Sequence, residues 1–404
     1  MALPNAFRRL MWSNLAAQAA EQTSLAAAPL IAVLALGAGA GQTGLLAAVQ
    51  SLPFLLLSLP AGVLADRTSK RRLMAAAELI RAAALLSLPA LLWAGQLSLT
   101  ALALVGALAA TGTVAYNVAA PAMLPLLVPR DALTRANTRL ELVRSIAFAA
   151  GPALAGILVA ASGGGVAFAL AAVLSVSAAL LLMGLPDHAP TGAPRGGRLS
   201  DVMEGLRFVR HEPLLRPVLL TAVAWNLGWF VLQGVYVPFA MTILGLDAAA
   251  IGITLASYGV GMVAGALLAP LLARRVAFGT LVAIGPMCSV AASLAMGATL
   301  ALPGITLPVL AFFLFGAGPI VWTIAQTTLR QVITPVAMLG RVSALMMMAT
   351  TGARPLGAAL GGLVGEHVGL GSAVWLSAAG FAVQAAIILR SPVPRLRALP
   401  QPAA

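Results

Sequence analysis

The chain has 404 residues, of which 61% are hydrophobic and only 9% are charged. A soluble domain carries about 25% charged residues, so this composition excludes an ordinary soluble protein and predicts an integral membrane protein. The formal net charge of +13 would suggest nucleic-acid binding in a soluble protein, but here the arginines occupy short connections between apolar runs, where they fit membrane topology and lipid headgroups.

Twelve apolar segments are long enough to cross a bilayer, which takes about 20 helical residues. The first of them is too long for a cleaved signal peptide and lacks a clear cleavage pattern, so it is predicted to be a spanning helix. The single cysteine, Cys288, excludes an intramolecular disulfide and a cysteine-based metal site. The predicted spans are 10–36, 42–65, 73–94, 98–127, 140–161, 166–185, 215–241, 248–273, 278–300, 304–332, 341–364 and 369–390.

The basic residues predict which side of the membrane each connection faces. They occur in alternate connections and at both ends of the chain, whereas the other connections carry no Lys or Arg. By the positive-inside rule, both termini are therefore predicted to be cytoplasmic. The basic connections hold Arg67, Lys70, Arg71 and Arg72; Arg130, Arg135 and Arg139; Arg195, Arg198, Arg207 and Arg210; Arg274 and Arg275; and Arg341.

The longest connection divides the chain into two halves of six helices each. It begins with a Pro/Gly-rich stretch and continues into a short amphipathic pattern, in which Val202, Leu206 and Val209 share one helix face. The predicted domains are an N-terminal bundle (1–185), a cytoplasmic linker with a short amphipathic helix (186–214), a C-terminal bundle (215–390) and a cytoplasmic tail (391–404).

The two halves also repeat each other. A shift of about 208 residues aligns the segment from Gly44 with the segment from Gly252, and a shift of about 206 places Tyr116 on Trp322 and Arg135 on Arg341. Chance similarity between apolar helices would not align proline and arginine residues of the loops equally well. The offsets therefore indicate an internal duplication, which is how parallel repeats of transporters are built.

The connection after the second predicted span carries a recognisable motif. Its sequence, GVLADRTSKRR, resembles the loop between the second and third helices of the major facilitator superfamily, whose pattern is G-x-x-x-D-R-x-x-[RK]-[RK]. The matching positions are Gly62, Asp66, Arg67, Lys70 and Arg71. The alternative is an ordinary basic loop. The second-half counterpart keeps only Arg274 and Arg275, so the acidic residue is present once.

Further segments resemble the branch of small bacterial exporters that includes the enterobactin exporter and macrolide-efflux proteins, the transmembrane secretion effectors. They are AELIRA from Ala77, LVPRDALTRAN from Leu127, GPALAG from Gly151 and TLRQVITPVAMLGRVSA from Thr328. Gly151 and Pro152 resemble an incomplete antiporter motif, and the fourth helix lacks the arginine that many drug/proton antiporters carry. The resemblance implies two six-helix bundles related by a pseudo-two-fold axis, with no cofactor or metal, acting as a monomer in the bacterial cytoplasmic (inner) membrane.

Charged residues within the spans are candidates for function, because a charge in the bilayer core costs on the order of 2.5–3.5 kcal/mol. Glu21 lies near the middle of the first span and is the candidate for proton coupling. Arg354 follows Arg341 by 13 residues, which places it about 20 Å along its helix. It could hold an anionic substrate, pair with Glu21, close a gate or form a structural ion pair.

Polar and aromatic residues at helical spacing predict a central cavity between the halves, with stabilising interhelical hydrogen bonds as the alternative. The stripe on the first span pairs through the repeat with a stripe on the seventh. The cavity or substrate candidates are Gln18, Gln50, Tyr116, Asn226, Trp229, Gln233, Tyr236, Tyr258, Trp322, Gln326 and Arg354.

Two pairs with the spacing E-x-x-R lie at the beginnings of the third and fifth spans. Glu78 and Arg81 form one pair, and Glu141 and Arg144 form the other. Residues three apart lie on one face of a helix, so each pair can form an ion pair. We expect both near the cytoplasmic surface as gate or structural pairs, together with the motif at 62–72.

The sequence as a whole predicts a secondary active transporter and no enzyme. The predicted function is proton-coupled export of a small amphiphilic compound by alternating access. The alternatives are uptake of a metabolite by the same fold and, from another class, a membrane scaffold or sensor without transport. A scaffold would not need buried charges such as Glu21 and Arg354, and a membrane enzyme would need a catalytic set that the motifs do not supply.

We predict that Asp66→Asn impairs transport with little loss of folded protein. An acid among four cations at the turn between two helices is suited to biasing the two access states, whereas it lies outside the apolar core. Labelling of single cysteines on the two faces of the membrane measures the balance between those states. An unchanged labelling ratio in the variant would contradict the role in gating.

Overall fold

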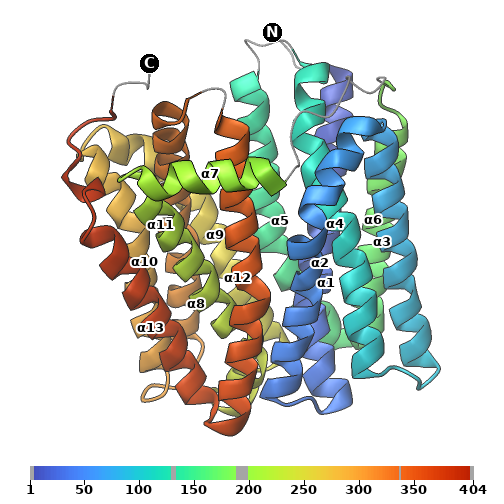
Figure 1. Ribbon diagram of the computed structural model, residues 1–404. Coiled ribbons are helices and arrows are strands. Elements are labelled where there is room, and N and C mark those ends of the chain that lie inside the picture. Colours follow the sequence, from blue (N-terminus) through green and yellow to red (C-terminus); the bar gives the residue numbers. More distant parts are fainter. Residues whose placement is uncertain (1–3, 129–132, 188–198, 336–337, 401–404) are drawn as a thin grey trace. The chain divides into compact units, whose positions relative to one another are not determined.

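The computed structural model describes residues 4–128, 133–187, 199–335 and 338–400 (Figure 1). In these ranges the chain is helical, and twelve of its thirteen α-helices have 20 residues or more. The long helices of the first half are α1 (Asn5–Leu36), α2 (Ala40–Arg67), α3 (Lys70–Trp93), α4 (Leu99–Leu127), α5 (Leu133–Ser162) and α6 (Gly164–Met183). Those of the second half are α8 (Leu215–Thr242), α9 (Ala248–Ala273), α10 (Phe278–Ala298), α11 (Thr306–Ile333), α12 (Leu339–His367) and α13 (Leu370–Leu389).

These helices confirm the all-α membrane fold predicted from hydropathy. Among the described residues, eleven helices are long and apolar enough to cross a membrane. The twelfth long helix, α12, does not reach that hydropathy within its described part, and it carries the charged residue Arg354. Most boundaries differ from the predicted ones by a few residues, because hydropathy marks the apolar stretch, whereas helices continue into the polar flanks until a capping residue or a turn ends them.

Local sequence signals explain several of the helix ends. The Ser69 hydroxyl accepts a hydrogen bond from the Arg72 amide at the start of α3, and Ser98 accepts one from Ala101 at the start of α4. Both satisfy amides that have no partner within the helix. At the end of α1, Gly37 adopts φ 64°, a left-handed conformation in which its amide reaches back to the Val33 carbonyl.

The chain forms two compact units that follow its two halves except for two short exchanged segments. Unit 1 comprises residues 1–38, 49–195 and 247–256, and unit 2 comprises 39–48, 196–246 and 257–404. The first turns of α2 therefore belong to unit 2, and the first turns of α9 belong to unit 1. The predicted domains, 1–185 and 215–390, do not include this exchange of residues 39–48 and 247–256.

Helix pairings repeat between the units. In unit 1, α1 packs against α5 and α6, and α3 packs against α4 and α6. In unit 2, α8 packs against α12 and α13, and α10 packs against α11 and α13. These are the same pairings six positions later in the order of long helices, so the duplication inferred from the sequence is also visible in the packing.

The segment between the halves contains the short helix α7 (Leu199–His211), while residues 188–198 lie outside the described part. Within unit 2, α7 runs across the bundle, in contact with α12 and α8 (Figure 1). Val209 of α7 is buried against Leu215, Val342 and Leu345, whereas Leu206 is exposed. The apolar face is thus narrower than the sequence pattern suggested. After α13, the 3₁₀ helix η3 (Val393–Arg395) packs against α10, so this part of the predicted tail is ordered on the bundle.

Two glycine crossings hold the exchanged segments in place. In unit 2, a β-carbon at Gly44 of α2 would lie 2.7 Å from the Ala358 carbonyl oxygen of α12 and against the backbone of Gly362. In unit 1, a β-carbon at Gly156 of α5 would lie 2.8 Å from Cα of Gly252 in α9. Small residues of this kind allow helix backbones to approach closely inside a membrane.

We predict that Gly44→Ala lowers the stability of the purified protein by about 1–3 kcal/mol, the usual cost of overpacking. The reason is that its new methyl group meets backbone atoms, which cannot rotate away. The matched control is Gly39→Ala, where the added β-carbon would have nothing within 4 Å. Thermal unfolding in detergent compares the two, and equal midpoints would contradict the close crossing.

Candidate functional site

The interior of unit 1 is organised around an ion pair on α3. Glu78 and Arg81 lie one turn apart and form a salt bridge, with side-chain exposures of 0% and 2%. Arg81 follows the first residue of α3 by eleven positions, about 16 Å along the helix axis. The sequence suggested a place near the membrane surface for this pair, but it lies well inside the bundle. The reason is that this face of α3 packs against α4 and α6.

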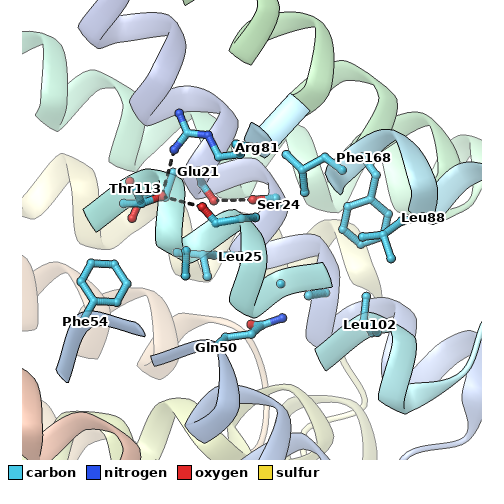
Figure 2. A pocket seen from close by; sticks show the side chains of 15 residues that line it. Glu21, Ser24, Leu25, Gln50, Phe54, Arg81, Leu88, Leu102, Thr113 and Phe168 are labelled. Atoms are coloured by element: carbon cyan, nitrogen blue, oxygen red, sulfur yellow. Dashed lines mark hydrogen bonds between the residues drawn. The ribbon is translucent and has the colours of Figure 1, made fainter. Parts of the chain in front are cut away.

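Arg81 links α3 to three other helices, and Figure 2 shows its bond to Thr113 of α4. Its guanidinium donates to Ser175 Oγ of α6 at 3.1 Å, to Thr113 Oγ1 of α4 at 2.9 Å and to the Ala17 carbonyl oxygen of α1 at 3.1 Å. Its remaining strong contact is the Glu78 carboxylate. A buried guanidinium is tolerated only when its charge is neutralised and its N–H groups are bonded, and these four partners meet both requirements.

A second polar layer lies beside this ion pair. Tyr116 of α4 is fully buried, with its hydroxyl 3.4 Å from Ser13 Oγ, and Ser13 donates to the Ala178 carbonyl oxygen at 3.1 Å. Gln18 Nε2 donates to Asn117 Oδ1 at 3.3 Å. Gln18 and Tyr116, both predicted to line a cavity, are therefore engaged in hydrogen bonds between α1 and α4.

A small cavity connects Glu21 with Arg81 inside unit 1 (Figure 2). Its volume of about 30 Å³ is enough for one or two water molecules. Polar side chains from four helices reach it, and the rest of its wall is apolar. The polar lining comes from Glu21 and Ser24 of α1, Gln50 of α2, Arg81 of α3 and Thr113 of α4. The structure thus brings the proton-coupling candidate Glu21 and the cavity candidate Gln50 into the lining of one cavity.

Arg354 of α12 lies half-buried in unit 2. Its Nε donates to Asn226 Oδ1 of α8 at 3.3 Å, and its guanidinium lies 5.4 Å from the centre of the Phe230 ring. Asn226 is buried and donates to the Ala222 carbonyl oxygen. The two predicted candidates Arg354 and Asn226 are therefore in direct contact, and a cation over an aromatic face gains additional electrostatic stabilisation.

An aromatic cluster fills the interior of unit 2. The Trp229 ring lies 4.9 Å from Tyr258 and 5.2 Å from Phe315, and Tyr236 lies 4.6 Å from Phe312. Trp229 and Tyr236 are buried, whereas Tyr258 is half-buried. These stacked and edge-on contacts make Trp229 and Tyr236 part of a packed core, and Tyr258 lies at its margin.

The other candidates of the second half are Gln233, Trp322 and Gln326. Gln233 is half-buried. Trp322 is half-buried as well, and its buried indole N–H has no hydrogen-bond partner among the described residues. Gln326 Nε2 donates to its neighbour Thr327 at 3.0 Å.

For the motif at 62–72, the structure describes the side chains from Thr68 to Arg72. Gly62, Asp66 and Arg67 lie in the last turns of α2, and their side chains lie outside the described residues. Lys70 is buried at the start of α3. Arg71 and Arg72 each form a salt bridge of 2.9 Å with Asp187, to which the Ser69 hydroxyl also donates.

The second E-x-x-R pair lies on the surface. Glu141 and Arg144 form a salt bridge of 2.8 Å, with side-chain exposures of 62% and 38%. Farther along α5, Gly151 allows α5 to approach α1, because a β-carbon there would meet Gln22. The neighbouring Pro152 lies inside α5 without ending it. The two pairs share a spacing and differ in burial, so the spacing alone could not distinguish them.

Sequence reasoning missed Thr113, Ser175 and Asp187. Thr113 and Ser175 are small hydroxyl residues in apolar helices, where such residues commonly bond to their own backbone. Only their contact with Arg81 identifies them. Asp187 was included in the Pro/Gly-rich start of the linker, although an acid near a basic motif is a possible signal. Among the described residues, there is no group of three or more His, Cys, Asp or Glu suited to a metal ion.

Comparison with known proteins places this arrangement among membrane transporters. A family model described as transmembrane secretion effector matches residues 4–403. The chain is 32% identical to the multidrug efflux pump Tap of Mycobacterium tuberculosis over 219 residues, which is 51% of the chain and about half (51%) of that protein. It is 30% identical to the enterobactin exporter EntS of Escherichia coli over 325 residues, covering 79% of the chain and 75% of that protein.

Solved structures show the same fold at low sequence identity. A bacterial homologue of the iron transporter ferroportin, in an inward-facing state, has a TM-score of 0.72 and 18% identity, covering 96% of this chain and 99% of that chain. A peptide transporter of the POT type has a TM-score of 0.77 and 12% identity, covering 98% and 96%. At these identities the likeness shows the fold alone.

We predict that Asp187→Asn lowers the melting temperature slightly at neutral pH and low salt. The Ser69 hydroxyl, with the charges of Arg72 and Arg71, holds the pKa of Asp187 below its usual value. A carboxyl with a lowered pKa stabilises the folded state above the pKa that it has in the unfolded chain, and this stabilisation is lost as the pH falls through its pKa in the folded protein. The difference from the wild type should therefore shrink in acid and in high salt.

Thermal unfolding in detergent over a pH series measures this effect. A double-mutant cycle with Arg71→Gln isolates the coupling of this pair from other consequences of each substitution. A difference in melting temperature that is independent of both pH and salt would show that Asp187 acts in another way.

Proposed function

Because the chain belongs to the transmembrane secretion effector family of the major facilitator superfamily, we propose that it exports a small amphiphilic organic compound in exchange for protons. The direction is supported by the relatives, which include a multidrug efflux pump and an enterobactin exporter. Drugs and siderophore-like compounds are therefore the substrate classes to test first.

The transport cycle that we propose is alternating access between two six-helix halves. The arginine asymmetry of the connections supports cytoplasmic termini in the bacterial cytoplasmic (inner) membrane, with lipid around a monomer. The pairing of helices repeats between the halves, as expected for a duplicated transporter whose halves move against each other. The motif at 62–72, including Asp66, is our candidate for the cytoplasmic gate.

The observation that carries the proton coupling is the position of Glu21. This carboxyl lies in the middle of an apolar helix and lines a cavity with room for water, next to the buried cation Arg81. Ionisable residues inside a membrane span mark proton and substrate pathways by default. A carboxyl with water on one side and apolar neighbours on the other can take up and release a proton as its access changes.

The substrate candidates that remain accessible lie in unit 2. Arg354 and Tyr258 are both half-buried, one a cation and the other an aromatic ring at the edge of a packed cluster. A ligand with an aromatic or apolar body and an anionic or acceptor group would match these two residues. Pockets of this composition use the apolar surface for affinity and a few polar groups for orientation.

We predict that Glu21→Gln abolishes proton-driven accumulation and leaves substrate binding intact. Glutamine keeps the size and hydrogen bonding of the side chain but cannot titrate. Purified protein in liposomes, given a pH difference, is assayed with a panel that includes ethidium and enterobactin. Counterflow exchange, which needs no net proton movement, should survive in the variant.

The control is Glu204→Gln, which neutralises an exposed carboxylate on α7 and should behave as the wild type. If Glu21→Gln protein still concentrates a panel compound against its gradient, Glu21 is not the coupling residue. If the wild type moves none of the panel, the proposed export of amphiphiles is wrong.

A further inference from the structure

The buried ion pair of unit 1 has a neutral counterpart at the equivalent place in unit 2. The starts of α3 and α10 are 208 residues apart, and this offset places Glu78 on Pro286, Arg81 on Ser289 and Ala17 on Trp225. Arg81 reaches the Ala17 carbonyl oxygen, and Trp225 Nε1 donates to Ser289 Oγ at 3.2 Å. Both bonds join the equivalent helices, α1 with α3 and α8 with α10.

The third helix of the junction, α6, likewise has an uncharged counterpart in α13. The starts of α6 and α13 are 206 residues apart, which places Ser175 on Phe381. Ser175 accepts from Arg81 in unit 1, whereas Phe381 lies edge-on to Trp225, with ring centres 6.5 Å apart, in unit 2. The same three-helix junction is therefore built once with charges and once with an aromatic pair and a neutral hydrogen bond.

The neutral junction of unit 2 shows that packing alone does not require the ion pair of unit 1. If the fold required an ion pair at the junction, the second copy would need one as well. A buried ion pair is seldom worth its desolvation cost for stability, and a well-packed apolar replacement is often at least as stable. Charges that persist inside a membrane span in one copy alone are therefore best explained by a role that the other copy does not have.

Arg81 is placed to act on Glu21 as well as on Glu78. It bonds Glu78 directly, and it lines the cavity that Glu21 also lines (Figure 2). The carbonyl of Ala17, which Arg81 holds, is one helical turn before Glu21 on the same face of α1. A single cation thus lies within one small polar region that contains two carboxyl groups.

Among the described residues that line the cavity or bond to Arg81, few other groups titrate. From α1 comes Glu21 itself, and from α4 comes the buried hydroxyl of Tyr116. The helix α6 contains no Asp, Glu, His, Lys, Arg, Cys or Tyr over Gly164–Met183. Two carboxyl groups and one permanent cation therefore dominate the charge balance, an arrangement in which the two carboxyls titrate as a coupled pair.

We propose that Glu21 and Glu78 share one exchangeable proton, with Arg81 as their common counter-charge. When Glu78 holds the proton it is neutral, and the charge of Arg81 stabilises the Glu21 carboxylate across the cavity. When Glu21 holds the proton instead, Arg81 stabilises the Glu78 carboxylate, to which it is bonded directly. The step is a proton transfer without any redox change. Glu21 and Glu78 together hold one proton until water on either side of the membrane adds or removes one. This inference rests on the proposed proton-coupled function and assigns its titrating unit to the first half.

Infrared difference spectroscopy tests the proposal without any substrate. Protein in liposomes is moved from mildly alkaline to mildly acidic buffer, and the C=O stretch of a protonated carboxyl is recorded. We expect a band that Glu78→Gln and Glu21→Gln both alter, because each substitution removes one of the two sites of the shared proton. The matched control is Glu141→Gln, which alters the exposed pair of the same spacing and should retain the band. A Glu78→Gln spectrum that superimposes on the wild type would overturn the proposal.

A double variant without either charge distinguishes loss of the proton site from misfolding. Glu78→Gln leaves Arg81 without its counter-charge, so Glu78→Gln/Arg81→Gln is made alongside it to remove both charges together. Circular dichroism and thermal unfolding should show that the double variant folds, and its infrared band should be absent. A folded double variant that keeps the band would also overturn the proposal.

Ethidium transport under a pH difference then separates this proposal from the broader one. Loss of accumulation in the double variant with counterflow retained supports the shared proton. Accumulation by the double variant equal to the wild type contradicts it. If the wild type itself shows no pH-driven movement, the proposed function fails, whereas the infrared result still decides whether Glu78 and Glu21 titrate together.

Discussion

The neutralisation of one buried guanidinium is the constraint on which the rest of unit 1 depends. Arg81 lies in the middle of an apolar bundle, where an unpaired charge or an unbonded N–H group costs several kcal/mol. Its partners come from α1, α4 and α6 as well as from α3, so these helices must approach to hydrogen-bonding distance at one point. Directional bonds of this kind specify the register of four helices, which apolar packing between leucine and alanine side chains does only weakly. The cavity beside Glu21 is bounded in part by Arg81 and by its partner Thr113.

Unit 2 reaches a comparable packing by other means. Its interior holds Trp229, Phe312 and Phe315 in edge-on contact, and its charged residue Arg354 remains half-buried beside Asn226. Aromatic contacts depend on area and shape, so they tolerate gradual change in a way that a saturated guanidinium does not. The two copies of the duplicated bundle are therefore stabilised by different kinds of contact. The first is held by a few strong directional bonds, and the second by many weak contacts around large rings.

The helices could be predicted from the sequence because a bilayer imposes a minimum apolar length, and the eighth predicted span, 248–273, agrees with α9 at both ends. The site could be predicted in part. Glu21 and Arg354 stand out because charges are rare in apolar spans, whereas the contact between Arg354 and Asn226 was not predicted. The depth of Glu78 and Arg81 could not be predicted, since Glu141 and Arg144 have the same spacing and lie on the surface. Burial depends on which face of a helix meets its neighbours, and that face is marked here by Thr113 and Ser175, which look ordinary in the sequence.

The difference between the two copies suggests how a duplicated transporter can separate its tasks. The proton proposed for unit 1 would change the charge balance around Arg81, where screening is weak and a unit charge has a large effect. No equivalent change is possible at the matching junction of unit 2, because Trp225, Ser289 and Phe381 do not titrate in the physiological range. In the proposed mechanism, the energetic effect of the proton is therefore confined to one half. In the proposed mechanism, the ring surfaces and the half-buried Arg354 of unit 2 can then vary with the substrate, without altering the residues proposed to bind the proton.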